Sequence, residues 1–368
     1  MSQEAATKNT SWGMTVNTVN NQMSQVKDEQ IPAELTTLCY IEQDGRYLML
    51  HRVKKEKDIN KDKWIGLGGH FEGTESPEEC VLREVKEETG LTLTSLRFRG
   101  LITFVSGDTC LEYMSLFTAD RFEGEVVECD EGTLEWVPKE DVYDLELWAG
   151  DKLFLRLLEE DRPFFSLKLV YDAAGRLQEA VLDGKRLELL DILEEDGTPT
   201  GEVQERDTAH RLGLRHATVH MWVLRETEDG NVEVLLQKRS QTKDSNPGCW
   251  DISSAGHISA GDEKLPAAVR ELSEELGIHA EPEDLTYLGF TRRNVLKPFY
   301  GKQWYDNQIS YIYVYRKEVD IDTIRLQEEE VEEVRWMKLD EVAARMEGDV
   351  SFKHCLNPEE IGLLQRSL

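Results

Sequence analysis

The chain has 368 residues, which is long enough for two domains of ordinary size that each bury a core of their own. Its 73 acidic residues outnumber the 43 basic ones, and the formal charge of −30 disfavours nonspecific binding to nucleic acid or to an anionic membrane. The six cysteines form no CxxC pair, and no stretch reaches the roughly 20 apolar residues of a membrane helix. We therefore expect a soluble, cytoplasmic protein with reduced thiols.

The first half of the chain carries strand and turn patterns after a polar tail. Residues 1–31 are rich in Ser, Thr, Asn and Gln without an apolar period, which predicts a disordered tail. Two apolar runs flank Asp44-Gly45 and predict a β-hairpin. Further elements follow the apolar pattern: strands over 101–105, 112–118 and 135–137, a helix over 153–158, and a hairpin over 165–182. This last hairpin closes a first domain that we place at residues 32–184.

A glycine-rich loop leads into a carboxylate-rich helix within residues 69–91. A serine-proline pair predicts the start of the helix and Gly90 its end. At 3.6 residues per turn Glu84, Glu87 and Glu88 are neighbours, and like charges at this spacing repel. A divalent cation such as Mg²⁺, which prefers oxygen ligands and bridges carboxylates to phosphates, relieves this repulsion. The alternative is a solvated acidic face, which the fixed spacing from the loop glycine disfavours.

The same pattern returns at residues 256–278, with Asp262 in the place of Glu75. A hairpin over 217–237 precedes this second copy, as a hairpin precedes the first. Two homologous domains are the economical explanation, and we place the second at residues 185–368. After residue 278 we expect strands at about 287–291 and 308–315, and helices at about 339–346 and 357–367.

Both copies resemble the Nudix box of the Nudix hydrolases: Gly, five residues, Glu, seven residues, then Arg-Glu-apolar-any-Glu-Glu-any-Gly-apolar. The first copy matches every constrained position, and the second departs only at Asp262. The resemblance implies an α/β (α+β) Nudix fold, with a mixed sheet sandwiched between helices, present twice. It also implies hydrolysis of nucleoside diphosphate derivatives that depends on Mg²⁺, or on Mn²⁺, by a monomer or a homodimer.

The resemblance further implies a role for each box residue. The metal ligands would be the Gly69 carbonyl, Glu84, Glu87 and Glu88 in the first domain, and Gly256, Glu271, Glu274 and Glu275 in the second. The pairs that tie loop to helix would be Glu75 with Arg83 and Asp262 with Arg270, the shorter aspartate loosening the second loop. The general base of the first domain is open between Glu84 and Glu131, and Glu271 is the counterpart of Glu84 in the second.

The first domain resembles the MutT-like oxidised purine nucleoside triphosphatases over residues 35–182. Trp148 and Asp151 fall where such enzymes carry a base-contacting tryptophan followed by acidic residues. An aromatic plate beside a carboxyl group can stack on a purine and read its donor edge. Two positions depart from the pattern, because Gly150 replaces one acid and Ile65 stands where an asparagine can contact the base. The expected reaction converts 8-oxo-dGTP to 8-oxo-dGMP and diphosphate; packing in the core is the alternative role for Trp148.

The second domain resembles isopentenyl-diphosphate isomerases and related hydrolases, through residues 196–216 and 247–257. In the isomerases a catalytic cysteine lies two residues before the loop histidine, and here that position is Ala255. The intact glutamates favour a diphosphatase of unknown substrate. An isomerase and a non-catalytic nucleotide-binding or regulatory module are the alternatives. Three histidines have either a structural role or a metal-binding role: His210, His216 and His257.

Overall fold

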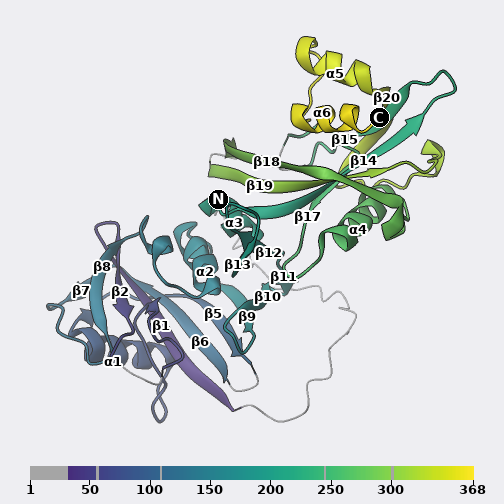
Figure 1. Cartoon of the computed structure of the whole chain (residues 1–368). Helices are drawn as coiled ribbons and strands as arrows, with labels where there is room; N and C mark the ends of the chain where they lie inside the picture. The colour runs from purple at the N-terminus through teal and green to yellow at the C-terminus, as the bar shows by residue number, and fades with distance from the viewer. Residues whose placement is uncertain (1–31, 55–57, 108–109, 244–245, 300–301) are drawn as a thin grey trace, which may run out of the picture.

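The computed structural model describes residues 32–54, 58–107, 110–243, 246–299 and 302–368, so the predicted tail over residues 1–31 lies outside the described residues. Two bodies, each built on one mixed sheet, are joined through a region that contains α2 (Ala149–Glu159) and α3 (Arg206–Leu212) (Figure 1). Within the described ranges, no helix is both long and apolar enough to cross a membrane. All six cysteines are free thiols.

The first sheet has the strand order β11-β10-β9-β5-β6-β1-β2-β3, with β8 paired to β2. Its strands are β1 (Ala33–Gln43), β2 (Arg46–His51), β3 (Trp64–Ile65), β5 (Arg97–Ser106), β6 (Cys110–Ala119), β8 (Thr133–Pro138), β9 (Phe165–Tyr171), β10 (Leu177–Leu182) and β11 (Lys185–Arg186). A separate ribbon pairs β4 (Thr92–Leu93) with β7 (Phe122–Glu123). Strand β1 runs parallel to β6 and antiparallel to β2, as the predicted hairpin requires. Asp44 and Gly45 form the tight turn of that hairpin with φ of 49° and 74°.

Helices cover both faces of the first sheet. Helix α1 (Pro77–Thr89) buries Val81 and Val85 in the core on one face. Helix α2 buries Leu153, Phe154 and Leu157 in the core on the other face, beside the short η1 (Val142–Asp144). The apolar positions of α1 lie four residues apart and therefore share one side of the helix, which leaves its glutamates to face the loop before it.

The second sheet repeats this plan, with the order β16-β15-β14-β19-β18 and with β17 and β20 paired to β14 and β15. Its strands are β14 (His216–Glu226), β15 (Val232–Arg239), β16 (Trp250–Asp251), β17 (Ser254–His257), β18 (Leu285–Phe299), β19 (Lys302–Tyr315) and β20 (Val331–Lys338). Strand β14 runs parallel to β19, as β1 runs parallel to β6. Helix α4 (Lys264–Leu276) packs on one face, and α5 (Leu339–Gly348) and α6 (Pro358–Arg366) pack on the other. Two short helices, η2 (Pro282–Asp284) and η3 (Ile321–Thr323), complete the body.

A two-stranded ribbon, β12 (Leu189–Leu193) with β13 (Pro199–Glu205), connects the two bodies. Leu189 and Val203 of the ribbon belong to the core of the first body, and Leu193 belongs to the core of the second. The ribbon therefore packs on both sides, and the boundary between residues 184 and 185 stays a prediction.

Candidate active sites

Helix α1 owes its position to signals at its two ends. Ser76 accepts a hydrogen bond from the N–H of Glu79, and the Glu79 carboxylate accepts one from the N–H of Ser76, which forms a capping box. Gly90 ends the helix at a φ of 76°, in the left-handed region that favours glycine. The rotation of the helix is thereby fixed, with its apolar side on the sheet and its glutamates toward the loop.

The first box brings Glu84 and Glu88 against the loop backbone. A Cβ atom on Gly69 would lie 2.5 Å from the Glu84 carboxyl carbon, so a larger residue there would displace that carboxylate. Glu88 is buried and accepts a hydrogen bond from the N–H of Gly68 at 2.9 Å. The Gly69 carbonyl accepts a hydrogen bond from the N–H of Thr37 at 2.9 Å and a longer one from the Cys80 thiol at 3.7 Å, so a metal at this oxygen would replace the weak thiol contact. Glu87, by contrast, is exposed to solvent.

The charges of this cluster fit a divalent cation. Burial, together with the nearby carboxylates of Glu131 and Glu84, raises the pKa of Glu88 to about 8. Glu131 forms an ion pair with Arg52, which also binds Asp58 at 2.7 Å. The carboxylates of Glu131 and Glu84 thus lie near enough to act on the charge of Glu88, and carboxylate oxygens are the ligands that Mg²⁺ or Mn²⁺ prefers.

Arg83 joins the loop to the helix. Its Nε and Nη2 donate to the two carboxylate oxygens of Glu75 at 2.7 and 2.9 Å, and its Nη1 donates to Glu84 at 2.8 Å. Nη2 also reaches the carbonyl oxygen of His70 at 3.0 Å. The hydrogen bonds from Arg83 hold the pKa of Glu75 at about 2, so the carboxylate stays ionised. All three nitrogens of the guanidinium thus form hydrogen bonds within the box, and the bond from Nη1 orients Glu84.

Trp148 and Asp151 lie at the start of α2, mostly buried. The Trp148 ring is 9 % exposed, its Nε1 donates to Asn60 at 2.8 Å, and the Lys63 ammonium lies 5.2 Å from the ring centre. Phe104 packs edge-on against the same ring, at 5.4 Å. Burial raises the pKa of Asp151 to about 8, so this group is a neutral carboxylic acid at pH 7. Tyr171 packs on the Trp148 ring as well, at 4.9 Å, so the tryptophan belongs to the core of the first body, and a base can stack on it only if Lys63 moves from the ring.

The second box repeats the backbone contacts of the first. Glu275 accepts a hydrogen bond from the N–H of Ala255 at 3.1 Å, as Glu88 does from Gly68. A Cβ on Gly256 would collide with the Glu271 carboxylate, as one on Gly69 would with Glu84. Burial and the carboxylate of Glu275 raise the pKa of Glu271 to about 7. Glu274, the counterpart of Glu87, is exposed.

The loop-to-helix pair is weaker in the second box. Arg270 donates through Nη1 to Asp262 at 2.6 Å, which is a single hydrogen bond. Glu75 of the first box accepts hydrogen bonds from Nε and Nη2 of Arg83, one with each carboxylate oxygen. The missing methylene therefore turns a two-point contact into a one-point contact.

Three histidines converge beside the second box, with ligand atoms that all lie within 4.8 Å of one another: His210, His216 and His257. Their Nδ1 atoms are occupied, by the carbonyls of Tyr305 and Leu214 at 3.0 Å each and by the Glu188 carboxylate at 3.4 Å. The Nε2 of His216 is buried and has no hydrogen-bond partner among the described residues. Burial lowers the pKa of His210 to about 2 and that of His216 to about 3, so both rings are neutral. The Nε2 atoms of His210 and His257 form a hydrogen bond at 3.2 Å, whereas that of His216 is left for a ligand, so the arrangement fits the structural and the metal-binding alternatives.

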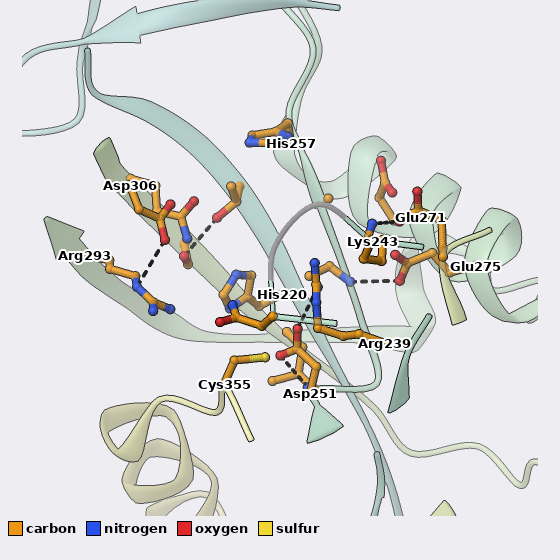
Figure 2. Close-up of a pocket in the computed structure, with 18 of the residues that line it drawn as sticks. His220, Arg239, Lys243, Asp251, His257, Glu271, Glu275, Arg293, Asp306 and Cys355 are labelled. Carbon is orange, nitrogen blue, oxygen red and sulfur yellow. Dashed lines mark hydrogen bonds and ion pairs between the residues drawn. The ribbon is translucent and has the colours of Figure 1, made fainter. Parts of the chain in front are cut away.

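A cavity of about 810 Å³ extends from the second box to the C-terminal helix (Figure 2). Several residues that line it were not predicted from the sequence: Glu188, Arg206, His220, Arg239, Lys243, Asp251, Arg293 and Glu360. They come from separate elements and share no local motif. One signal was available, because Thr218 and His220 are polar residues at alternate positions of the predicted apolar run 217–224 and so point to the same face of the sheet.

Comparison with known proteins identifies the two boxes. The family model of the NUDIX domain matches residues 34–158 and 214–354. The chain is 34% identical over 163 residues to an uncharacterized Nudix hydrolase of Clostridium acetobutylicum, covering 44% of this chain and 76% of that protein. It is 34% identical over 133 residues to the oxidized purine nucleoside triphosphate hydrolase of Danio rerio, covering 36% and 83%.

Two further matches cover 42% and 41% of this chain. Nudix hydrolase 3 of Arabidopsis thaliana is 40% identical over 156 residues, which is 42% of this chain and 20% of that protein. Among solved structures, a MutT protein of Bacillus halodurans is 28% identical and covers 41% of this chain and 97% of its own, with a TM-score of 0.38.

Proposed function

This chain is a Nudix hydrolase that acts on pyrophosphate bonds, and from that premise we propose that each of its two domains is a magnesium-dependent diphosphatase. The observation that supports two sites is the repeated contact of glycine with glutamate, Gly69 with Glu84 and Gly256 with Glu271, beside a second, buried glutamate held by a backbone N–H. Both boxes therefore keep the carboxylates that hold a cation.

In the first domain Glu84, Glu87, Glu88 and the Gly69 carbonyl would hold Mg²⁺. The cation supplies charge neutralisation for adjacent phosphates. Arg83 keeps the Glu84 carboxylate oriented, and Arg52 does the same for Glu131. Glu84 is our candidate for the base that takes a proton from the attacking water, with Glu131 as the auxiliary group. In the second domain Glu271 has the role of Glu84.

We assign 8-oxo-dGTP as the substrate of the first domain. The neutral Asp151 carboxylic acid offers a donor and an acceptor, and this pair complements a lactam edge of an oxidised purine, which carries a carbonyl beside an N–H. Trp148 supplies the stacking surface once Lys63 moves aside. The likeness to the Danio rerio hydrolase of oxidized purine nucleoside triphosphates supports the same assignment.

Steady-state kinetics with 8-oxo-dGTP and dGTP test this substrate. We expect kcat/KM for 8-oxo-dGTP to exceed that for dGTP by at least about tenfold, since one well-satisfied polar contact discriminates by that much. The products should be 8-oxo-dGMP and diphosphate. Equal kcat/KM for both nucleotides, or release of a single phosphate, would overturn the assignment.

For the second domain we propose a diphosphatase rather than an isomerase. Ala255 has no thiol or acid for proton transfer, and charged side chains dominate the cavity, whereas an isoprenoid chain needs an apolar one. If the second domain binds another metal besides the one at its box carboxylates, His210, His216 and His257 are the ligands of that metal. Conversion of isopentenyl diphosphate to its isomer would refute this proposal. Tight nucleotide binding without turnover, unchanged in Glu275→Gln, would instead indicate a regulatory module.

A further inference from the structure

The cavity of the second domain has a far end that the diphosphate chemistry does not use. Figure 2 shows Glu271 and Glu275 at one side of the cavity, with Arg293 and Asp306 at the opposite side and His220 between them. The far end is built from β14, β18, β19 and helix α6, and we call His220, Thr291, Arg293, Asp306 and Glu360 the floor of the cavity.

The contacts of Glu360 show that the floor is a preorganised polar site. Its carboxylate is 1 % exposed, and three side chains hydrogen-bond it: His220 Nδ1 at 2.8 Å, Trp222 Nε1 at 3.0 Å and Thr291 Oγ1 at 3.4 Å. A buried carboxylate is costly unless it is hydrogen-bonded in this way. Because Glu360 holds the Nδ1 of His220, the opposite nitrogen of that ring is the one left to contact a ligand in the cavity.

The charges of the floor are already paired. Arg293 Nε lies 3.2 Å from Asp306, and Arg239 Nη1 lies 3.0 Å from Asp251 beside them. An additional phosphate or carboxylate would compete with these acids for their cations. An aliphatic chain would offer no hydrogen bond to the polar atoms that still face the cavity, such as the Nε2 of His220. A hydroxyl group, which donates and accepts, satisfies both members of such a pair.

From this arrangement we infer that the floor is a recognition subsite for a neutral, hydroxyl-rich group, such as a sugar or polyol, attached to the diphosphate that the second domain cleaves. The inference rests on the proposed diphosphatase function and adds the class of group beyond the diphosphate. Apolar residues are few among those that line the cavity: Pro247, Ile252, Ala255 and Trp304. The subsite thus selects against isoprenoid diphosphates by leaving buried polar groups unpaired.

The test uses the full chain carrying Glu88→Gln, so that the first domain does not contribute. The probes are ADP-ribose and UDP-glucose, which carry a sugar on the diphosphate, and isopentenyl diphosphate, which carries an apolar chain. The variants Arg293→Met and His220→Gln remove floor contacts. Arg292→Met is the matched control, because the Arg292 side chain is exposed on the same strand.

We expect kcat/KM for at least one sugar-bearing probe to exceed that for isopentenyl diphosphate by at least about tenfold. Arg293→Met and His220→Gln should remove this preference through KM, and Arg292→Met should keep it. An equal or higher kcat/KM for isopentenyl diphosphate overturns the inference, as does a preference that survives both floor variants.

A binding measurement separates this inference from the proposed function. If none of the three probes is hydrolysed, the diphosphatase proposal fails, and calorimetric titration of the same probes with Mg²⁺ then decides the subsite. Binding of a sugar-bearing probe that Arg293→Met weakens by about tenfold sustains the subsite. Binding of neither sugar-bearing probe overturns it.

Discussion

At the scale of single residues, each candidate site depends on a glycine that admits a glutamate. Gly69 and Gly256 have no Cβ at the point where the Glu84 and Glu271 carboxylates lie, and neither has a positive φ. The requirement is therefore steric and not conformational. An added methyl group would push the carboxylate away from the position in which it binds a cation.

Gly69→Ala should accordingly lower the turnover of the first domain by about 10- to 100-fold at subsaturating Mg²⁺, through weaker metal binding. Gly256→Ala should do the same for the second domain. Each variant is the control for the other, and titration of activity with Mg²⁺ measures the effect. Loss of both activities in either variant would mean that the substitution disturbs the whole molecule.

Asp151 makes the first domain sensitive to pH. Because its pKa is raised to about 8, the carboxyl group keeps its proton below that pH and releases it above. The hydrogen bond donated to an oxidised purine is therefore present at pH 7 and lost as the pH rises through 8. At saturating Mg²⁺, which keeps Glu88 ionised, KM for 8-oxo-dGTP should rise about tenfold between pH 7 and 9 in the wild type and stay flat in Asp151→Asn, whose amide does not titrate. A flat wild-type profile would contradict this role.

At the scale of elements, local signals predicted the box helices but not the long strands around the cavity. The capping serine, the terminal glycine and the spacing of Val81 and Val85 act within α1 itself, so the sequence contains all of them. Strands β18 and β19 extend well beyond the predicted 287–291 and 308–315. Their additional residues include Arg293 and Asp306, polar side chains that face the cavity and so break the apolar alternation that predicts a strand.

The same reasoning explains the part of the sites that the sequence could not predict. The box carboxylates are neighbours on one helix, and their spacing alone brings them together. The three histidines meet only because α3 packs against β19, where His210 bonds the carbonyl of Tyr305. Glu360 reaches His220 from the C-terminal helix, 140 residues away in the sequence. Contacts of this range depend on the tertiary fold.

Shortening the carboxylate side chain of the first loop-to-helix pair and lengthening that of the second should have opposite effects on stability. Glu75→Asp should lose one of the two hydrogen bonds to Arg83 and lower the free energy of unfolding of the first domain. Asp262→Glu should allow the second contact to Arg270 and stabilise the second domain by at most about 0.5 kcal/mol, because that pair is more exposed. Urea denaturation measures both. A larger gain from Asp262→Glu than the loss from Glu75→Asp would contradict the comparison.

At the scale of the whole molecule, a buried ion pair joins the two bodies. Arg156 of α2 donates to Glu205 at 3.0 Å, and the two residues are 7 % and 5 % exposed. Glu205 also caps α3 by accepting from the N–H groups of Asp207 and Thr208. Helix α2 begins at the candidate base-binding residues of the first domain, and α3 carries His210 of the second. The pair therefore links the helices that carry residues of both sites.

Arg156→Met should leave Glu205 buried without its cation and lower the free energy of unfolding by about 3 kcal/mol. Arg186→Met is the control, because Arg186 is exposed and its ion pair with Glu179 should contribute less than about 1 kcal/mol. Chemical denaturation of the full chain compares the two variants. An equal and small effect of both would show that the interdomain pair does not hold the bodies together.

Mg²⁺-dependent turnover in single-box variants tests whether the two domains carry separate diphosphatase sites. The substrates are 8-oxo-dGTP, dGTP, ADP-ribose and isopentenyl diphosphate, each assayed with the wild type, Glu88→Gln and Glu275→Gln. We predict that 8-oxo-dGTP hydrolysis falls by at least about tenfold in Glu88→Gln alone, and that any second activity falls only in Glu275→Gln. Absence of 8-oxo-dGTP turnover in the wild type, or its survival in Glu88→Gln, would show that the first domain does not carry this activity.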